Sequence, residues 1–111
     1  MTVNDQLRIR MKGHLGGQLS RFREQVGLSP YGRLDDDWDE EFGQRELRSK
    51  EQGHVKLTLW RWADDDWMIS LAYERDPLPL DEAEALRRNI LDAAAAVGLT
   101  VTFQFPPQNL Q

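Results

Sequence analysis

The chain contains no cysteine, so it can form neither a disulfide framework nor a thiolate metal site. It also lacks any run of about 18 apolar residues, which a membrane-spanning helix would need. The N-terminus shows no positively charged segment followed by an apolar stretch, so we expect no secretory signal. These absences favour a cytoplasmic protein that makes no membrane contact.

Positive charge is scarce, because 14 Lys and Arg face 19 Asp and Glu, which leaves a net charge of -5. That balance opposes binding to nucleic acid and permits a basic protein partner. The length of 111 residues suits a single domain, which we place at residues 1–105, with residues 106–111 as a disordered tail.

Chemistry-bearing motifs are also missing. The two histidines, His14 and His54, have no partners at the spacing of a dyad or zinc site, and no serine lies in a nucleophile motif. Asp35, Asp37, Asp39 and Glu46 have the spacing of calcium ligands in an EF-hand loop, but Glu40 occupies the position that requires glycine. We therefore expect a non-enzymatic domain with no cofactor and no metal.

Two runs within residues 54–74 alternate between apolar and polar side chains, which predicts a β-hairpin with one buried face. The apolar sets share a face only if odd-numbered residues pair with odd-numbered ones. The resulting pairs are Arg61–Trp67, Leu59–Ile69, Leu57–Leu71 and Val55–Tyr73. Trp62 then pairs with Asp66, and residues 63–65 form a three-residue loop in which an aspartate adopts positive φ.

Residues 3–26 allow two interpretations. Apolar side chains at spacings of three and four predict one amphipathic helix, with Leu7, Met11, Leu15, Leu19, Phe22 and Val26 on its buried stripe. Gly13, Gly16 and Gly17 would weaken that helix. The alternative is a strand over residues 7–12, a glycine loop and a short helix from Gln18 to Val26.

The rest of the chain predicts a polar edge strand over residues 44–50, a helix from a cap at Asp81 to Val97, and a last strand over residues 100–105. In that last strand, Val101, Phe103 and Phe105 would share one face. We therefore predict an α+β fold, with an antiparallel or mixed sheet of about four strands and two helices on one face. The predicted order is α-β-β-β-α-β, and the alternative start gives a ferredoxin-like β-α-β-β-α-β.

The order α-β-β-β-α-β, the small size and the sequence pI of about 5.0 resemble the acidic dimeric chaperones of bacterial secretion systems. The resemblance is one of topology, and topology does not imply function. It is compatible with a homodimer.

Two groups of residues are the candidate partner-binding site. Trp60 and Trp62 fall opposite the core face of the hairpin, where exposed tryptophans are typical of binding hot spots. The second group is an acidic run around Trp38, and it comprises Asp35, Asp36, Asp37, Asp39, Glu40 and Glu41. Alternatively, residues 27–43 cover the two tryptophans as a second small core.

These groups predict a small acidic protein-binding domain with an inhibitor, immunity or chaperone-like role, whose partner could be basic. Aromatic side chains on an open sheet can also stack RNA bases, but we expect no basic face around Trp60 and Trp62 and hence no nucleic acid. The alternative function is a small-ligand-binding or enzymatic domain that uses the Trp60/Trp62 face.

Overall fold

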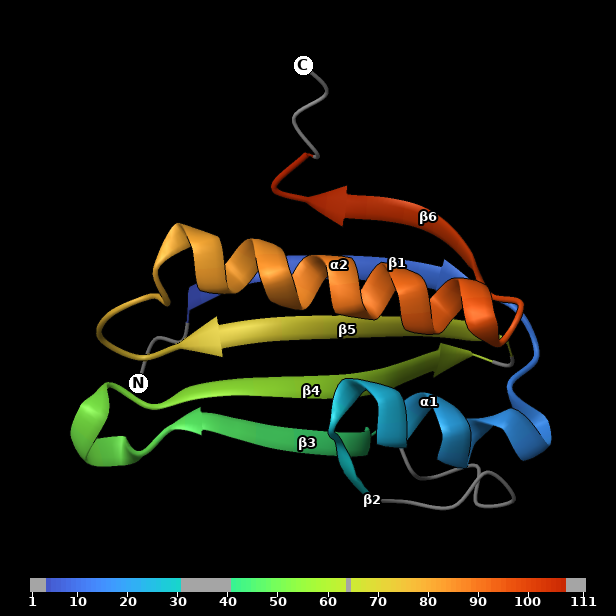
Figure 1. The fold of residues 1–111 in the computed structure, drawn as a ribbon, viewed down its shortest axis with the longest axis horizontal. Coiled ribbons are helices and arrows are strands. Elements are labelled where there is room, and N and C mark those ends of the chain that lie inside the picture. Colours follow the sequence, from blue (N-terminus) through green and yellow to red (C-terminus); the bar gives the residue numbers. More distant parts are fainter. Residues whose placement is uncertain (1–3, 31–40, 64, 108–111) are drawn as a thin grey trace.

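The computed structural model describes residues 4–30, 41–63 and 65–107. One antiparallel sheet of six strands, in the order β2-β3-β4-β5-β1-β6, forms the first layer (Figure 1). The strands are β1 (Asn4–Lys12), β2 (Ser29–Pro30), β3 (Glu41–Arg48), β4 (Val55–Ala63), β5 (Asp66–Tyr73) and β6 (Thr100–Phe105). The helices are α1 (Leu19–Val26) and α2 (Leu80–Ala96), with short 3-10 turns at Gly16–Gln18 and Lys50–Gln52.

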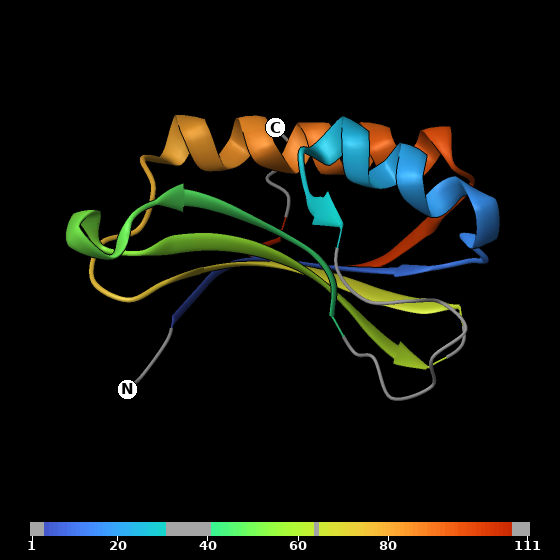
Figure 2. The same cartoon turned by 90° about the horizontal axis from the view of Figure 1, so that it is seen from below.

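Both α-helices lie on the same side of the sheet, as Figure 2 shows. The predicted α+β class with two helices is therefore confirmed. The predicted count of about four strands is too low, because β1 and the two-residue β2 add to it. Without β2 and β3, the element order is β-α-β-β-α-β, which is the order of the alternative prediction.

The single N-terminal helix is wrong, because Asn4–Lys12 is a strand that pairs with both β5 and β6. Leu7, Ile9 and Met11 alternate into the core, and Ile9 lies outside the predicted helical stripe. Gly13 follows at φ +146°, a conformation that a right-handed helix cannot contain. The order that suggested secretion chaperones is therefore not the order of this chain.

The hairpin register is confirmed for all four predicted odd-numbered pairs, from Val55–Tyr73 to Arg61–Trp67. The predicted Trp62–Asp66 pair is wrong, since Ala63 pairs with Asp66 and a bulge lies between Arg61 and Ala63. Asp65 adopts φ +64°, the positive value expected for an aspartate in this loop. The backbone N–H of Gly13 donates to the Asp65 carbonyl at 2.8 Å, which ties the loop to the end of β1.

The face assignment in the last strand is also wrong. Val101 pairs with Met11 on the core side, but Phe103 pairs with Arg10 on the opposite side. The register shift between these two pairs is a β-bulge that contains one extra residue, Thr102. Because side chains alternate between the two faces of a sheet, the extra residue reverses the faces of the residues that come after it. Phe103 and Phe105 therefore both lie on the side opposite the core.

The core lies between the sheet and the helices. It contains Phe22 and Val26 from α1, Ile90 from α2 and the inward side chains of the four central strands. Phe42 of β3 packs edge-on against Trp67 at 5.4 Å between ring centroids. The helix α2 begins at Leu80 after Pro79, so the predicted Asp81 cap is wrong, while Gly98 ends the helix at φ +78° as expected.

Candidate functional site

The sheet face opposite the helices, here called the open face, presents side chains in rows that cross the strands. One row runs Gln44, Thr58, Ser70, Arg8 and Phe105, and the next runs Glu41, Trp60, Met68, Arg10 and Phe103. Residues paired across antiparallel strands project to the same side of the sheet, so each row lies on the open face. The face thus changes from acidic at β3 to basic at β1 and aromatic at β6.

Large apolar side chains are exposed on the open face. We call Trp60, Trp62, Met68, Phe103 and Phe105 the aromatic surface. The exposed fractions are 64% for Trp62, 47% for Phe103 and 38% for Phe105. Soluble proteins rarely leave such side chains together in water without a binding role.

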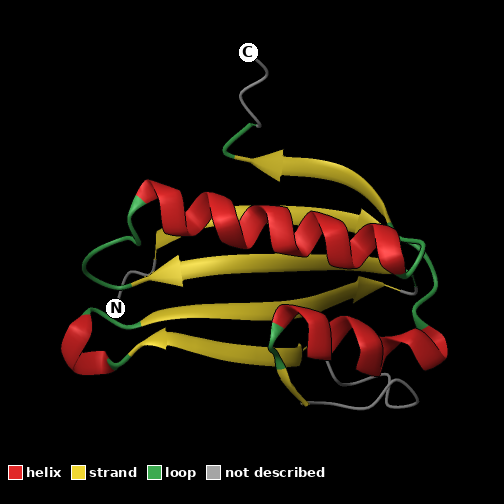
Figure 3. Cartoon of the chain, in the orientation of Figure 1, coloured by secondary structure: helices red, strands yellow, loops and turns green. Residues whose placement is uncertain are grey.

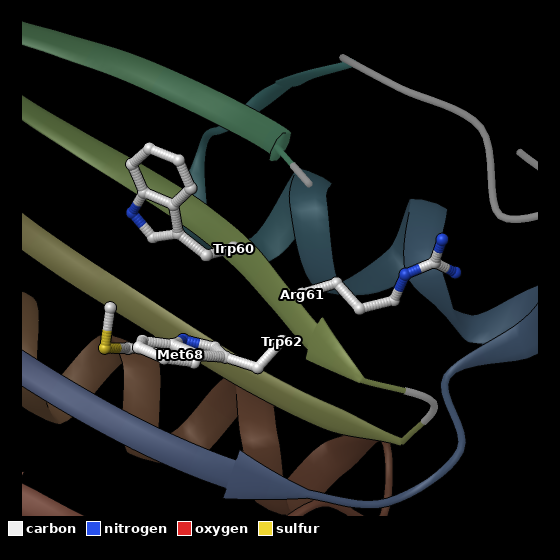
Figure 4. Close-up of a pocket in the computed structure, with 4 residues that line it drawn as sticks. All are labelled: Trp60, Arg61, Trp62 and Met68. Atoms are coloured by element: carbon white, nitrogen blue, oxygen red, sulfur yellow. The ribbon is translucent and has the colours of Figure 1, made fainter. Parts of the chain in front are cut away.

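The two tryptophans and Met68 line a hollow of about 240 Å³ (Figure 4). Trp60 Nε1 donates a hydrogen bond of 3.0 Å to Ser70 Oγ, which holds the half-buried indole in one orientation. Trp62 remains on the open face despite the bulge. Arg61 extends away from both indoles, and its guanidinium lies 4.6 Å from the ring centroid of Phe42 on the core side.

Cations from β1 lie directly beside the aromatic surface. The Arg10 guanidinium is 5.4 Å from the Trp62 ring centroid, and that of Arg8 is 5.1 Å from the Phe105 centroid. Both distances fall within the range of cation–π attraction. The expectation that no basic face adjoins the tryptophans is therefore wrong, because β1 is a strand of the sheet and not part of a helix, so its alternate residues lie on the open face.

A second hollow, of about 320 Å³, lies on the other side of Trp60, and most of the residues that line it carry polar or charged side chains. We call it the acidic hollow. It is lined by Asp5, Glu41, His54, Lys56, Thr58, Trp60, Ser70, Ala72 and Glu74. Three carboxylates face one lysine and one histidine there, so the hollow favours a cationic group beside an aromatic wall.

The imidazole of His54 connects two strands at the rim of this hollow. Its Nδ1 lies 3.1 Å from Glu74 Oε1, and its Nε2 lies 3.7 Å from Glu46 Oε2. The backbone of His54 adopts φ +51° at the start of β4. This arrangement engages both ring nitrogens with carboxylates and orients the ring between β3 and β5.

The structure brings together only part of the predicted site. Trp60, Trp62 and Glu41 lie on the open face, and Glu41 accepts a hydrogen bond from the Gln44 side chain. Trp38, Asp35, Asp36, Asp37, Asp39 and Glu40 lie outside the described residues. Phe42, which could have helped to cover the tryptophans, instead packs in the core on the helix side.

Sequence reasoning missed Arg8, Arg10, Phe103 and Phe105 as members of the same face. The alternation of Arg8 and Arg10 with Leu7, Ile9 and Met11 was the available signal for the arginines. The bulge at Thr102 leaves no comparable signal, since the residues of β6 alternate without interruption in the sequence.

Among residues 4–30, 41–63 and 65–107, no group of three metal-ligating acidic, histidine or cysteine side chains is close enough to hold an ion. No helix in the described part of the chain is long and apolar enough to cross a membrane. Comparisons with protein-family models, with curated proteins and with solved structures find no match to this chain.

Proposed function

We propose that this chain is a small non-enzymatic binding domain and that its open face binds another protein. The observation that supports this most is the aromatic surface on a sheet face that neither α-helix covers. Aromatic residues and arginine are enriched at protein interfaces. Inhibitor, immunity and chaperone-like roles are all compatible with a surface of this kind.

The aromatic surface offers a substantial gain on burial. A buried aromatic side chain contributes about 150–250 Å², so covering the exposed parts of Trp62, Phe103 and Phe105 removes roughly 300 Å² of apolar area from water. At about 25 cal/mol per Å², this is on the order of 8 kcal/mol before the costs of association. Those costs are of similar size, so the arginines and the acidic groups of the open face must contribute to affinity as well.

The charge on the open face favours a protein over a nucleic acid. Single-stranded nucleic acid needs a positively charged groove along its backbone. Here Glu41, Asp5 and Asp66 share the face with Arg8 and Arg10, and the whole chain carries a net charge of -5. A protein partner can match such an alternation of signs, whereas a polyphosphate cannot.

The acidic hollow indicates what one part of the partner presents. Its carboxylates lie next to the Trp60 indole, so a lysine or arginine side chain would meet both an opposite charge and an aromatic face. The acidic run at residues 35–41 would add negative charge toward the same basic partner. A basic segment on the partner therefore belongs to the proposal.

A second candidate function is the binding of a small polar ligand in the acidic hollow. A volume of about 320 Å³ with convergent polar groups falls at the lower end of ligand sites. This candidate predicts that Glu74→Gln abolishes binding while Trp62→Ala, outside that hollow, leaves it unchanged. The leading proposal predicts the opposite, namely that Trp62→Ala weakens binding more than Glu74→Gln does.

The test uses three tagged proteins in extracts of the native cell: wild type, the double variant Trp62→Ala/Phe105→Ala, and the control Leu80→Ala. Leu80 is 73% exposed at the start of α2, so its truncation removes exposed apolar surface away from the open face. A captured partner should then be purified and its affinity measured by calorimetry. We expect the double variant to bind at least about 10-fold more weakly, as for a hot-spot aromatic.

The Leu80→Ala control should bind like wild type. A partner that binds the double variant and wild type equally would exclude the open face as its binding surface. Loss of binding in Leu80→Ala alone would move the interface to the helix side. Circular dichroism spectra of all three proteins establish that the substitutions leave the fold intact.

A further inference from the structure

The open face is self-complementary about one particular two-fold axis. Consider an axis that lies in the plane of contact and runs along β5. It places β4 over β1 of a second copy and β3 over β6 of that copy, because the strand order is β3-β4-β5-β1-β6. Each row of the face then meets the same row of the second copy in reverse order.

This superposition pairs unlike groups. Trp60 lies opposite Arg10 of the second copy, since the two residues belong to one row on either side of Met68. Lys56 lies opposite Asp5 of the second copy, since these two flank Ala72 in another row. Cation–π and ion-pair contacts therefore form twice, once on each side of the axis.

The same arrangement covers the exposed aromatic edge. Phe103 and Phe105 of β6 come over Glu41 and Gln44 of β3 in the second copy. Along the axis, the side chains of β5 meet their own copies, and Met68, Ser70 and Ala72 are small or flexible enough to pack there. Asp66 also meets its own copy, but Lys12 lies beside it in the ladder and offsets the repulsion.

The other in-plane axis, perpendicular to the strands, lacks this complementarity. It would place each strand over itself in reverse, so that Arg8 and Arg10 of the two copies would face one another. Like charges directly opposed across an interface are destabilising. The charge pattern thus selects the axis that runs along β5.

The size of the face also fits a second copy. Four strands of eight or nine residues and β6 of six residues, at about 4.8 Å spacing and about 3.3 Å per residue, give a face roughly 24 Å wide and up to roughly 27 Å long. The projected area of roughly 600 Å² is about three-quarters of the roughly 800 Å² per partner of a standard interface.

We propose that two copies of this chain form a face-to-face dimer through their open faces, with Trp60 on Arg10 and Lys56 on Asp5 across the interface. This inference rests on the proposed function, because it names a second copy as the protein that the open face binds. It assigns a role to Arg10 that a purely acidic binding domain would not need.

The test measures mass by sedimentation velocity from about 5 to about 500 µM, a range that detects dissociation constants of weak and moderate dimers. Wild type should reach the dimer mass within this range. Lys56→Glu alone and Asp5→Lys alone should each weaken the dimer at least about 10-fold, because each opposes like charges at two symmetric contacts.

Two further samples separate this result from a folding defect. An equimolar mixture of the Lys56→Glu and Asp5→Lys proteins should form a heterodimer, since each contact again joins opposite charges. The double variant carrying both substitutions should form a homodimer for the same reason. Both should recover the wild-type dissociation constant to within about threefold.

Wild type that remains a monomer at the highest concentration would overturn the dimer. A dimer that is indifferent to both single variants, or single variants whose mixture does not recover, would also overturn this interface. If wild type is a monomer but captures another protein through Trp62, the proposed function survives and only this inference fails. If neither association occurs, both are excluded.

Discussion

At the scale of single residues, Leu59 tests the hairpin most directly. Its side chain is fully buried and pairs with Ile69 in the middle of the sheet. Leu59→Ala should lower the free energy of unfolding by about 2–5 kcal/mol, because it removes core contacts and leaves a cavity. Urea denaturation measures this, with Trp62→Ala as an exposed control that should change stability by less than about 1 kcal/mol. Equal effects of the two substitutions would contradict the assigned faces.

Arg87 is a charged residue that hydropathy patterns would place on the surface of α2, yet it is only 2% exposed. Its Nη1 donates to Gln104 Oε1 at 3.0 Å and to the Pro106 carbonyl at 2.7 Å, and its Nη2 contacts Glu84. The guanidinium thus links the end of β6 to α2 through hydrogen bonds.

We expect Arg87→Ala to cost about 1.5–3 kcal/mol of unfolding free energy, since it removes the charge-assisted hydrogen bonds of a buried guanidinium. The neighbouring Arg88 is exposed, so Arg88→Ala is the matched control and should be nearly neutral. Thermal and urea unfolding of both variants provide the measurement. A neutral Arg87→Ala would mean that the β6 end is held in place by other contacts.

At the scale of elements, the conformation of the glycines decides whether the N-terminal segment is one helix or a strand followed by a helix. Figure 3 shows β1 as a strand and α1 as a separate helix. Gly13 joins β1 to the segment that follows, at φ +146°, and an added Cβ would lie 2.9 Å from Leu99 Cδ2. Gly17 lies outside that conformation and has no atom within 4 Å of an added Cβ.

These two glycines give opposite predictions for substitution by alanine. Gly13→Ala should destabilise the fold by more than about 1 kcal/mol, because its backbone conformation is strained for any L side chain. Gly17→Ala should be neutral or stabilise by up to about 1 kcal/mol, because it reduces the entropy of the unfolded chain. If residues 3–26 were one helix, both substitutions would stabilise. The free energies of unfolding of the two variants therefore distinguish a strand plus helix from a single helix.

At the scale of the whole molecule, the field of the acidic run should influence association. Six carboxylates lie within residues 35–41, on a chain of net charge -5. Replacing Asp35, Asp36 and Asp37 with Asn should slow association with a basic partner and leave stability nearly unchanged, because such fields mainly steer encounter. Stopped-flow binding at low and high salt measures the association rate, since salt screens the field over roughly 8–10 Å. An association rate that ignores both salt and the substitutions would remove the run from the binding mechanism.

The sequence by itself determined the α+β class, the α2 helix and the hairpin register. Each depends on local patterns. Val55, Leu57 and Leu59 share the buried face with Ile69 and Leu71 only if odd-numbered residues pair with odd-numbered ones, and the short loop then sets which pairs form. The sequence also identified Trp60 and Trp62 as the outward aromatic pair, because that property follows from the same parity.

Only the tertiary structure decided what surrounds those tryptophans. The six apolar residues of the stripe from Leu7 to Val26 are buried in a strand plus helix as they would be in one helix, so periodicity separated the two interpretations only at Ile9. Pairing of β1 with both β5 and β6 resolved it and brought Arg8 and Arg10 to the open face. The bulge at Thr102 then turned Phe103 and Phe105 to that face, and a bulge is set by the match between two strands rather than by either sequence alone.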